Sequence, residues 1–156
     1  YYSAFSPIPD SAARLPLARP PLVREHRLYQ ADWLMRFYGF ERAEIVGESE
    51  DLELEIDPKL AWALKHRGDF PLDLNLADRE RMLRVPGVGV RSVDRMLEVR
   101  RFKALTLADV RRLTRGIEKL KPFIVTTDWS PGALTDRADL RERMTPKAPP
   151  QQQSLF

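Results

Sequence analysis

LRVPGVGVRSV, residues Leu83–Val93, is the stretch that governs the fold. Gly87 and Gly89 stand one residue apart, and a residue without a Cβ adopts positive φ angles and lets other groups approach its backbone closely. The helical spacing of apolar residues ends before Pro86 and begins again at Val90. The pattern therefore predicts two short helices joined by a sharp turn.

The predicted turn has the chemistry of an anion-binding site. The first amides of the second helix have no acceptor inside that helix, and the helix dipole places partial positive charge at the same end. Together with the two glycine amides they form a concave set of N–H donors, which suits a phosphate oxygen. Val88 is expected to pack down onto the two helices, and Arg91 to reach the same phosphate or the next one.

The string resembles the helix-hairpin-helix signature, in which apolar-Pro-Gly-apolar-Gly precedes a variable, a basic and a small hydroxyl residue, and then alanine. Val93 stands where alanine is usual, which would spread the two helices slightly. The sequence also resembles the competence-type DNA-receptor modules at further positions, which are Asn75-Leu76-Ala77, Leu83, Met96, Arg100, Phe102, Leu107 and Asp109-Val110. The resemblance implies sequence-independent binding to the sugar-phosphate backbone of duplex DNA by Pro86, Gly87, Val88, Gly89, Arg91, Ser92 and Arg95.

A second hairpin is expected within residues 107–121, since these motifs usually occur in pairs. Its turn, Thr114-Arg115-Gly116, holds one glycine and no proline, so it is a degenerate copy that completes the core more than it binds. One functional hairpin implies a Kd on the order of 10⁻⁴–10⁻⁶ M at physiological salt. Two other interpretations stay open, namely a plain tight turn between packed helices and a hairpin that binds protein.

The formal net charge of +3 hides a strong asymmetry. Residues 41–57 carry eight acids and one base, whereas residues 79–121 carry thirteen bases and five acids. Such polarity predicts one face that attracts a polyanion and another that repels it. The basic segment favours DNA, because backbone binding draws on counterion release. The acidic run lacks the ligand spacing of a calcium loop, and we expect a solvated face or a surface that repels DNA and so orients the module.

The chain is predicted to be all-α, built from short helices separated by glycine and proline. Trp33, Phe37 and Trp62 fall at helical spacing and are expected in the core, with base stacking as the second interpretation. Residues 47–56 are expected to form a loop or a weak strand, and Asn75 to cap the helix that follows it. The expected helices span residues 22–38, 57–67, 77–84, 90–100 and 107–114, with short helical turns at 41–46 and before Pro122.

The wider sequence resembles the C-terminal region of a bacterial family of radical SAM proteins of DNA modification and repair. The strings that carry this resemblance, over about residues 1–124, are YYSAFSPIP, REHRLYQADWLMRFYGF, LELEIDPKLAWALKHR, the hairpin, LTLADVRRL and KPFI. The resemblance implies that the chain is the C-terminal part of a longer enzyme and that YYSAFSPIP is the last strand of its barrel. For the full-length enzyme it implies a 4Fe-4S cluster held by three upstream cysteines, S-adenosyl-L-methionine, and a uracil-DNA glycosylase-like partner.

No catalytic residue carries over by this resemblance, because the chain contains no cysteine. Tyr2, Ser3 and Phe5 either line the barrel mouth or pack within the strand. The expected domains are a barrel end and linker (1–21), a helical connecting region (22–70), the helix-hairpin-helix domain (71–129) and a disordered tail (130–156).

Several classes of function are excluded or disfavoured by composition. Without cysteine, this chain forms no disulfide, no thiolate zinc site and no iron–sulfur ligation. No apolar run approaches the roughly 20 residues that cross a bilayer, so no membrane association is expected and a cytoplasmic location is the default. His26 and His66 lack partners at metal-binding spacing, and neither a Ser/His/Asp set nor a nucleotide-binding glycine loop is present. Autonomous catalysis by this chain is not expected.

The chain ends in two large apolar residues, which a solvated tail rarely carries without a use. The final string resembles the pentapeptide that binds the bacterial sliding clamp, with Gln153 where leucine is preferred. By that resemblance, the clamp contacts are made by Gln152, Ser154, Leu155 and Phe156.

Two hypotheses of different classes follow. The first is a DNA-tethering module at the C-terminus of a repair or modification enzyme. The second is an adaptor that recruits repair or replication partners through the hairpin and tail and has no DNA affinity of its own. Salt-dependent binding of duplex DNA separates them.

Overall fold

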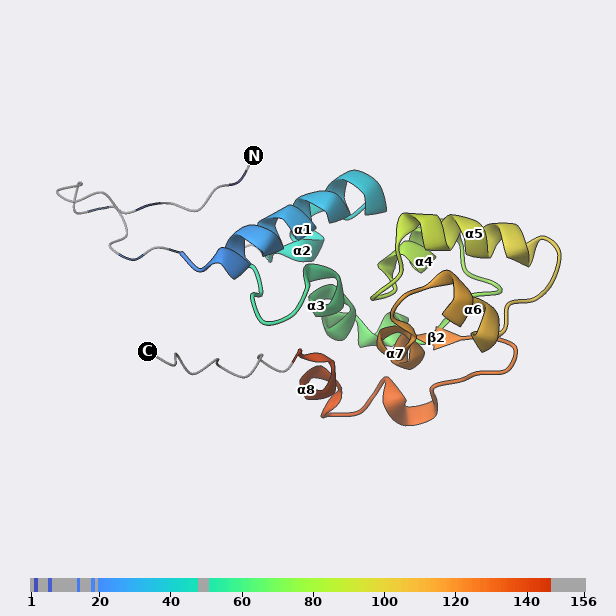
Figure 1. The fold of residues 1–156 in the computed structure, drawn as a ribbon. Coiled ribbons are helices and arrows are strands. Elements are labelled where there is room, and N and C mark those ends of the chain that lie inside the picture. The colour runs from blue at the N-terminus through green and yellow to red at the C-terminus, as the bar shows by residue number, and fades with distance from the viewer. Residues whose placement is uncertain are drawn as a thin grey trace, which may run out of the picture.

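The computed structural model describes residues 20–47 and 51–146, together with Tyr2, Ser6, Arg14 and Ala18. These residues are mostly helical, which confirms that the chain is mainly α (Figure 1). Their α-helices are α1 (Leu22–Tyr38), α2 (Arg42–Ile45), α3 (Pro58–Lys65), α4 (Arg79–Arg84), α5 (Val90–Arg100), α6 (Leu107–Leu113), α7 (Ile117–Leu120) and α8 (Leu140–Met144). The shorter elements are the 3-10 turns η1 (Arg67–Asp69), η2 (Lys121–Phe123) and η3 (Gly132–Leu134) and the strands β1 (Leu72–Asp73) and β2 (Ile124–Val125), which pair in parallel.

Local capping sets where α3 and α6 begin. The Asp57 carboxylate accepts a hydrogen bond from the Leu60 amide at 2.9 Å, and Pro58 follows in the first turn of α3. At the start of α6, the side chains of Thr106 and Asp109 each accept a hydrogen bond from the other's backbone amide. Both helices begin where the sequence predicts. Such starts are predictable because a cap depends only on residues up to three positions away.

The predicted cap of α4 is wrong. Asp78, and not Asn75, accepts the hydrogen bond from the Arg81 amide at 2.8 Å, so the helix begins later than expected. Asn75 instead bonds the segment before α6. Its Oδ1 accepts from the Leu105 amide at 2.7 Å, and its Nδ2 donates to the Leu105 carbonyl at 3.2 Å. The amide side chain thus joins two segments that are distant in sequence.

The core is continuous from α1 to α8, across the boundary that the sequence predicts at residue 70. Residues 51–56 form no regular strand, yet Leu52 and Ile56 are buried, so this loop supplies part of the core. The largest fully buried side chains come from all parts of the described chain and are Ile56, Leu60, Leu74, Met82, Met96, Leu105, Leu120, Phe123 and Ile124.

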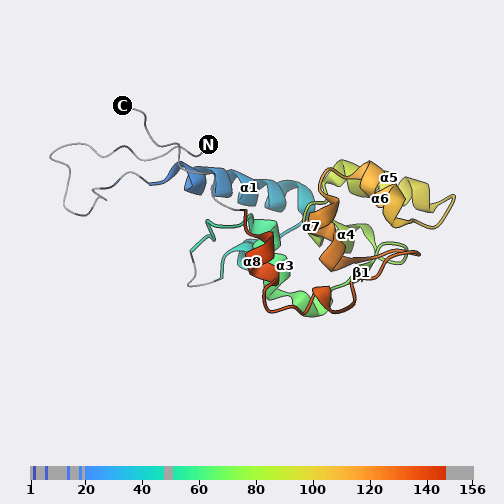
Figure 2. The ribbon, with the colours of Figure 1, turned by 60° about the horizontal axis from the view of Figure 1, so that its bottom comes forward.

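The expectation that Trp33 and Phe37 are core residues is wrong, although Trp62 is buried as expected. The residues Trp33 and Phe37 are 58% and 51% exposed. The helix α1 packs on α3 and α4 and lies at the edge of the helical body (Figures 1 and 2). It buries Ala31 and Leu34, whereas Trp33 and Phe37 lie four residues apart on its other side. The two rings contact each other, with centroids 4.7 Å apart.

The predicted disorder from residue 130 is wrong as far as residue 146, where the description ends. Residues 130–146 contain η3 and α8, and Leu140 is 3% exposed against the core. The Thr135 hydroxyl donates to the Pro122 carbonyl, and Arg141 forms ion pairs with Glu53 and Glu55. These anchors are single residues without helical spacing, which is why the sequence pattern does not reveal them.

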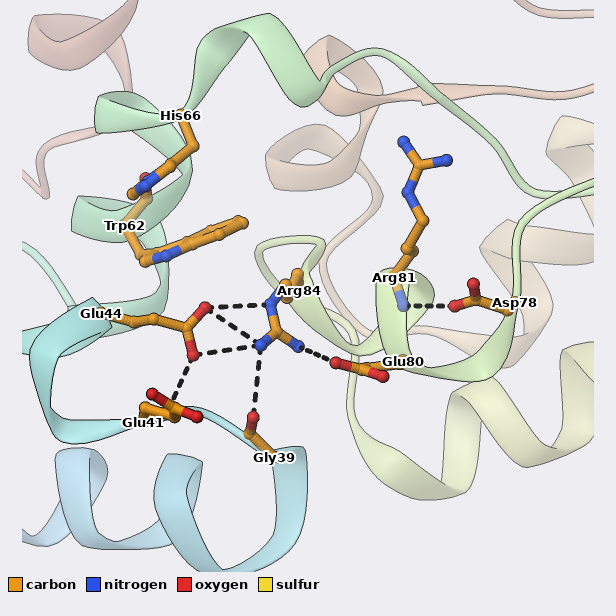
Figure 3. A network of polar contacts seen from close by, with 9 residues as sticks. All are labelled: Gly39, Glu41, Glu44, Trp62, His66, Asp78, Glu80, Arg81 and Arg84. Carbon is orange, nitrogen blue, oxygen red and sulfur yellow. Dashed lines mark hydrogen bonds and ion pairs between the residues drawn. The ribbon is translucent and has the colours of Figure 1, made fainter.

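Arg84 is the last residue of α4, and its side chain joins this helix to the corner between α1 and α2 (Figure 3). Its Nη2 donates to the two Glu44 carboxylate oxygens at 3.0 and 3.1 Å and to the Gly39 carbonyl at 3.2 Å. The guanidinium also lies 4.7 Å from the centroid of the Phe40 ring and 5.6 Å from that of Trp62. With 15% of the side chain exposed, this is a largely desolvated ion pair in a hydrogen-bonded network.

We expect Arg84→Ala to lower the free energy of unfolding by about 2–3 kcal/mol, because the change leaves Glu44 partly buried without its partner. Chemical denaturation monitored by circular dichroism measures this change. Arg81→Ala is the matched control, since Arg81 belongs to the same helix and is exposed, and Figure 3 shows its side chain pointing away from the network. Equal losses for the two variants would contradict the assignment of Arg84 as the tie.

Candidate nucleic-acid interface

The turn between α4 and α5 is built from buried apolar residues and one exposed glycine. Val85, Pro86 and Val88 are buried, and Gly87 is exposed at the tip. The Val88 amide donates to the Val85 carbonyl at 3.3 Å, which closes the turn. The predicted packing of Val88 is confirmed, at 3% exposed.

The two glycines of the turn have different roles. Gly87 has φ +79°, and a Cβ at this position would lie 2.9 Å from the Cδ1 atom of Leu120, so both the backbone conformation and the close approach require glycine. Gly89 has φ −99° and ψ 163°, which any residue adopts. Its Cβ would meet only the Tyr38 hydroxyl, at 3.7 Å. Positive φ is therefore needed at Gly87 alone.

Several amides at the tip lack an acceptor among the described residues, as the first turn of a helix leads one to expect. The Gly89 carbonyl accepts from the Val93 amide at 3.0 Å as the first bond of α5. Between residues 87 and 92, only the Val88 amide has an acceptor within the described part of the chain. The five amides without one are those of Gly87, Gly89, Val90, Arg91 and Ser92. These groups are donors without protein partners at the positive end of the α5 dipole.

Cationic side chains stand beside these amides. Arg91 and Arg95 lie one turn apart on α5, both exposed, and neither forms an ion pair with any residue that the structure describes. The nearest acid on the helix, Asp94, is paired with Arg79 at 2.8 Å. The start of α5 therefore presents a net positive surface.

Ser92, a predicted DNA-binding residue, has its hydroxyl engaged inside the fold. Its Oγ donates to the Leu113 carbonyl at 2.7 Å, at the end of α6. The hydroxyl hydrogen is therefore unavailable to a phosphate, and the backbone amide is the donor that Ser92 can offer. This bond also joins the first hairpin to the second.

The second turn, Thr114-Arg115-Gly116, packs against the first. Gly116 has φ −137° and ψ 55°, and its carbonyl accepts from the Lys119 amide at 3.0 Å. Leu120 of α7 is fully buried and touches Gly87, as its distance from a Cβ built there indicates. The second unit thus supplies core residues beside the first turn.

Lys59 was not identified from the sequence, because a lysine in the first turn of a helix carries no motif. It is 6% exposed, and its ammonium donates to the Val88 carbonyl at 2.6 Å, behind the turn. The Nζ atom also lies 4.6 Å from the centroid of the Tyr38 ring. Burial lowers the pKa of Lys59 to about 7, an effect that Asp57 opposes and Arg84 assists.

The remaining sequence candidates do not converge on this site. His26 is exposed on α1, and His66 stacks on Trp62 with ring centroids 4.3 Å apart. Among the described residues, no group of His, Asp and Glu side chains could hold a metal ion. Tyr2 packs edge-on against Tyr29, with ring centroids 5.3 Å apart. The following predicted residues lie outside those that the structure describes: Ser3, Phe5, Gln152, Ser154, Leu155 and Phe156.

Comparisons of this chain with family models, with curated proteins and with solved structures find no match. None of the helices in the described residues is both long enough and apolar enough to span a bilayer.

The buried Lys59 predicts a pH-dependent stability. Unfolded lysine keeps its proton up to about pH 10.4, whereas folded Lys59 releases it near pH 7, so between these values the unfolded state binds more protons. The stability that Lys59 contributes is therefore fully present above the unfolded pKa of about 10.4. It decreases as the pH falls and is lost as the pH passes through the folded pKa of about 7. From pH 7 to 9, the free energy of unfolding should rise by about 1–3 kcal/mol relative to Lys59→Met.

Urea denaturation at several pH values measures this difference. Lys65→Met, which removes an exposed lysine from the same helix, is the control and should follow the unmodified chain. Parallel pH profiles for the unmodified chain and Lys59→Met would show that Lys59 keeps an ordinary pKa.

Proposed function

We propose that this chain is a sequence-independent DNA-binding module of the helix-hairpin-helix type, located at the C-terminus of a bacterial radical SAM enzyme of DNA repair or modification. Its hairpin, residues 85–92, binds the sugar-phosphate backbone. The observation that carries the proposal is the set of amides at the tip, which have no acceptor in the described chain and adjoin Arg91 and Arg95.

The donor set favours a phosphate over a base edge. Main-chain N–H groups and flexible guanidinium groups bind anionic oxygens, which occur at every nucleotide, and so carry no sequence information by themselves. The turn itself offers no Asn or Gln side chain, the residue types that read adenine, and Ser92 is engaged with Leu113. Binding should therefore be weak and independent of DNA sequence.

The distribution of charge supports an oriented approach. Two of the acids in residues 41–57, Glu44 and Glu53, are held by Arg84 and Arg141, on elements other than α5. The exposed cations Arg91 and Arg95 belong to the basic segment, residues 79–121, and lie beside the amides that lack acceptors. These guanidinium groups, unpaired within the described chain, therefore attract a polyanion to the start of α5, whereas the ion pairs of Glu44 and Glu53 weaken any repulsion by the acidic segment.

In this proposal, the catalytic chemistry belongs to an upstream barrel with a 4Fe-4S cluster and S-adenosyl-L-methionine, and the module holds the enzyme on DNA in the bacterial cytoplasm. A uracil-DNA glycosylase-like protein and the sliding clamp are the proposed protein partners, the latter through Gln152, Ser154, Leu155 and Phe156. The alternative is an adaptor that recruits such partners and lacks DNA affinity of its own.

The test is fluorescence anisotropy of the whole chain with labelled duplexes of unrelated sequence at several salt concentrations. We expect a Kd on the order of 10⁻⁴–10⁻⁶ M at physiological salt, with log K falling linearly against log salt. Gly89→Asp should abolish binding equally for all sequences, because it places a carboxylate beside the amides at a position that accepts a Cβ. Gly87 is unsuitable for this purpose, since its replacement strains the fold.

Gly68→Asp is the matched control, because it adds the same charge at a glycine of η1 that has no neighbour within 4 Å of an added Cβ. Arg91→Ala and Arg95→Ala should each weaken binding uniformly and reduce the salt slope by about one. Losses that differ strongly between sequences would contradict backbone binding. No retention even at low salt would favour the adaptor.

A further inference from the structure

A cavity of about 590 Å³ opens beside the hairpin, between α1, the start of α3 and the turn itself. Tyr29, Trp33 and Tyr38 of α1 line one side, and Gly87–Gly89 line another. A volume of this size lies within the roughly 300–1,000 Å³ of pockets that hold small molecules. The proposed phosphate site is therefore at the edge of a cavity with an aromatic wall.

Tyr38 of the aromatic wall packs against the core, whereas Trp33 does not. Trp33 is 58% exposed, and its ring contacts the equally unburied Phe37. An exposed indole at the edge of a cavity offers a flat apolar surface to a planar ligand. Every nucleobase has a π face, so stacking on such a platform tolerates any base.

The polar groups divide the cavity into two chemical zones. On the hairpin side are the unpartnered amides and the exposed Lys119, which favour an anion. On the α3 side, the Asp57 carboxylate, already an acceptor for the Leu60 amide, repels an anion. Lys59 also lines the cavity from α3, and its ammonium is bonded to the Val88 carbonyl, so its charge adds to the hairpin side. A ligand that places a phosphate at the turn and an uncharged ring against α1 satisfies both zones.

We propose that the cavity receives an unpaired base of the DNA strand whose phosphate is bound by the hairpin. The module then prefers DNA with a gap, a bulge or an extruded base to a continuous duplex. A paired base would first have to leave the stack, which costs free energy, whereas an unpaired base enters without that cost. This inference rests on the proposed backbone binding and adds the preferred DNA structure to it.

The experiment compares a continuous duplex with the same duplex that contains one unpaired 2-aminopurine in a bulge. We expect the bulged DNA to bind about 5- to 150-fold more tightly, the range that corresponds to stacking of one base on an aromatic side chain. The 2-aminopurine emission should fall on binding, because stacking quenches it. Trp33→Ala should remove both the preference and the quenching, and Trp33→Phe should keep most of each.

Phe102→Ala is the control, because Phe102 is an 83% exposed aromatic residue that follows the far end of α5. It should leave the preference and the quenching unchanged. Equal affinity of the unmodified chain for the two DNAs, or unchanged emission of the bound probe, overturns the inference while salt-dependent duplex binding still supports the proposed function. Absence of binding to either DNA at low salt overturns both.

Discussion

The guanidinium of Arg84 is the polar contact that ties α4, and with it the turn, to the α1–α2 corner. It belongs to the last residue of α4, immediately before the turn, and it is held by Glu44 and by the Gly39 carbonyl at the α1–α2 corner. Because it also lies over the rings of Phe40 and Trp62, it is bound by charge, hydrogen bonds and aromatic faces together. The direction in which the hairpin leaves α4 is thereby coupled to the position of α1.

Three further contacts hold the hairpin from behind and from the side. Lys59 donates to the Val88 carbonyl, Leu120 fills the space that a side chain at Gly87 would need, and Ser92 bonds the end of α6. None of these contacts uses the unpartnered amides of residues 87 and 89–92, so these donors stay without acceptors in the described chain. Donors fixed in this way lose little freedom when an anion binds, which is the physical basis of preorganisation.

Local features of the fold could be predicted from the sequence, because their causes are near in sequence. Apolar spacing and terminal glycine or proline define α1 and α5 at the predicted bounds, and Asp57 and Thr106 cap the helices that follow them. The amides of the candidate site could be predicted for the same reason, since two glycines and a helix start lie within five residues.

Features that depend on distant partners could not be predicted. Asn75 has the chemistry of a helix cap, yet its amide bonds Leu105, and Asp78 caps α4 instead. Trp33 has the spacing of a core residue, but whether that side of α1 is covered depends on which helices pack on it. The anchoring of α8 by Leu140 and the burial of Lys59 likewise arise from tertiary contacts.

Lys59 places a titratable group behind the hairpin, where its Nζ atom donates to the Val88 carbonyl. Because burial lowers the pKa of Lys59 to about 7, its side-chain amine is only partly protonated at neutral pH. An anion held by the neighbouring amides would stabilise the protonated form, and the complex would take up hydrogen ions as it assembles. The enthalpy of association would then vary with the ionisation heat of the buffer, a calorimetric trait of this hairpin that exposed lysines do not confer.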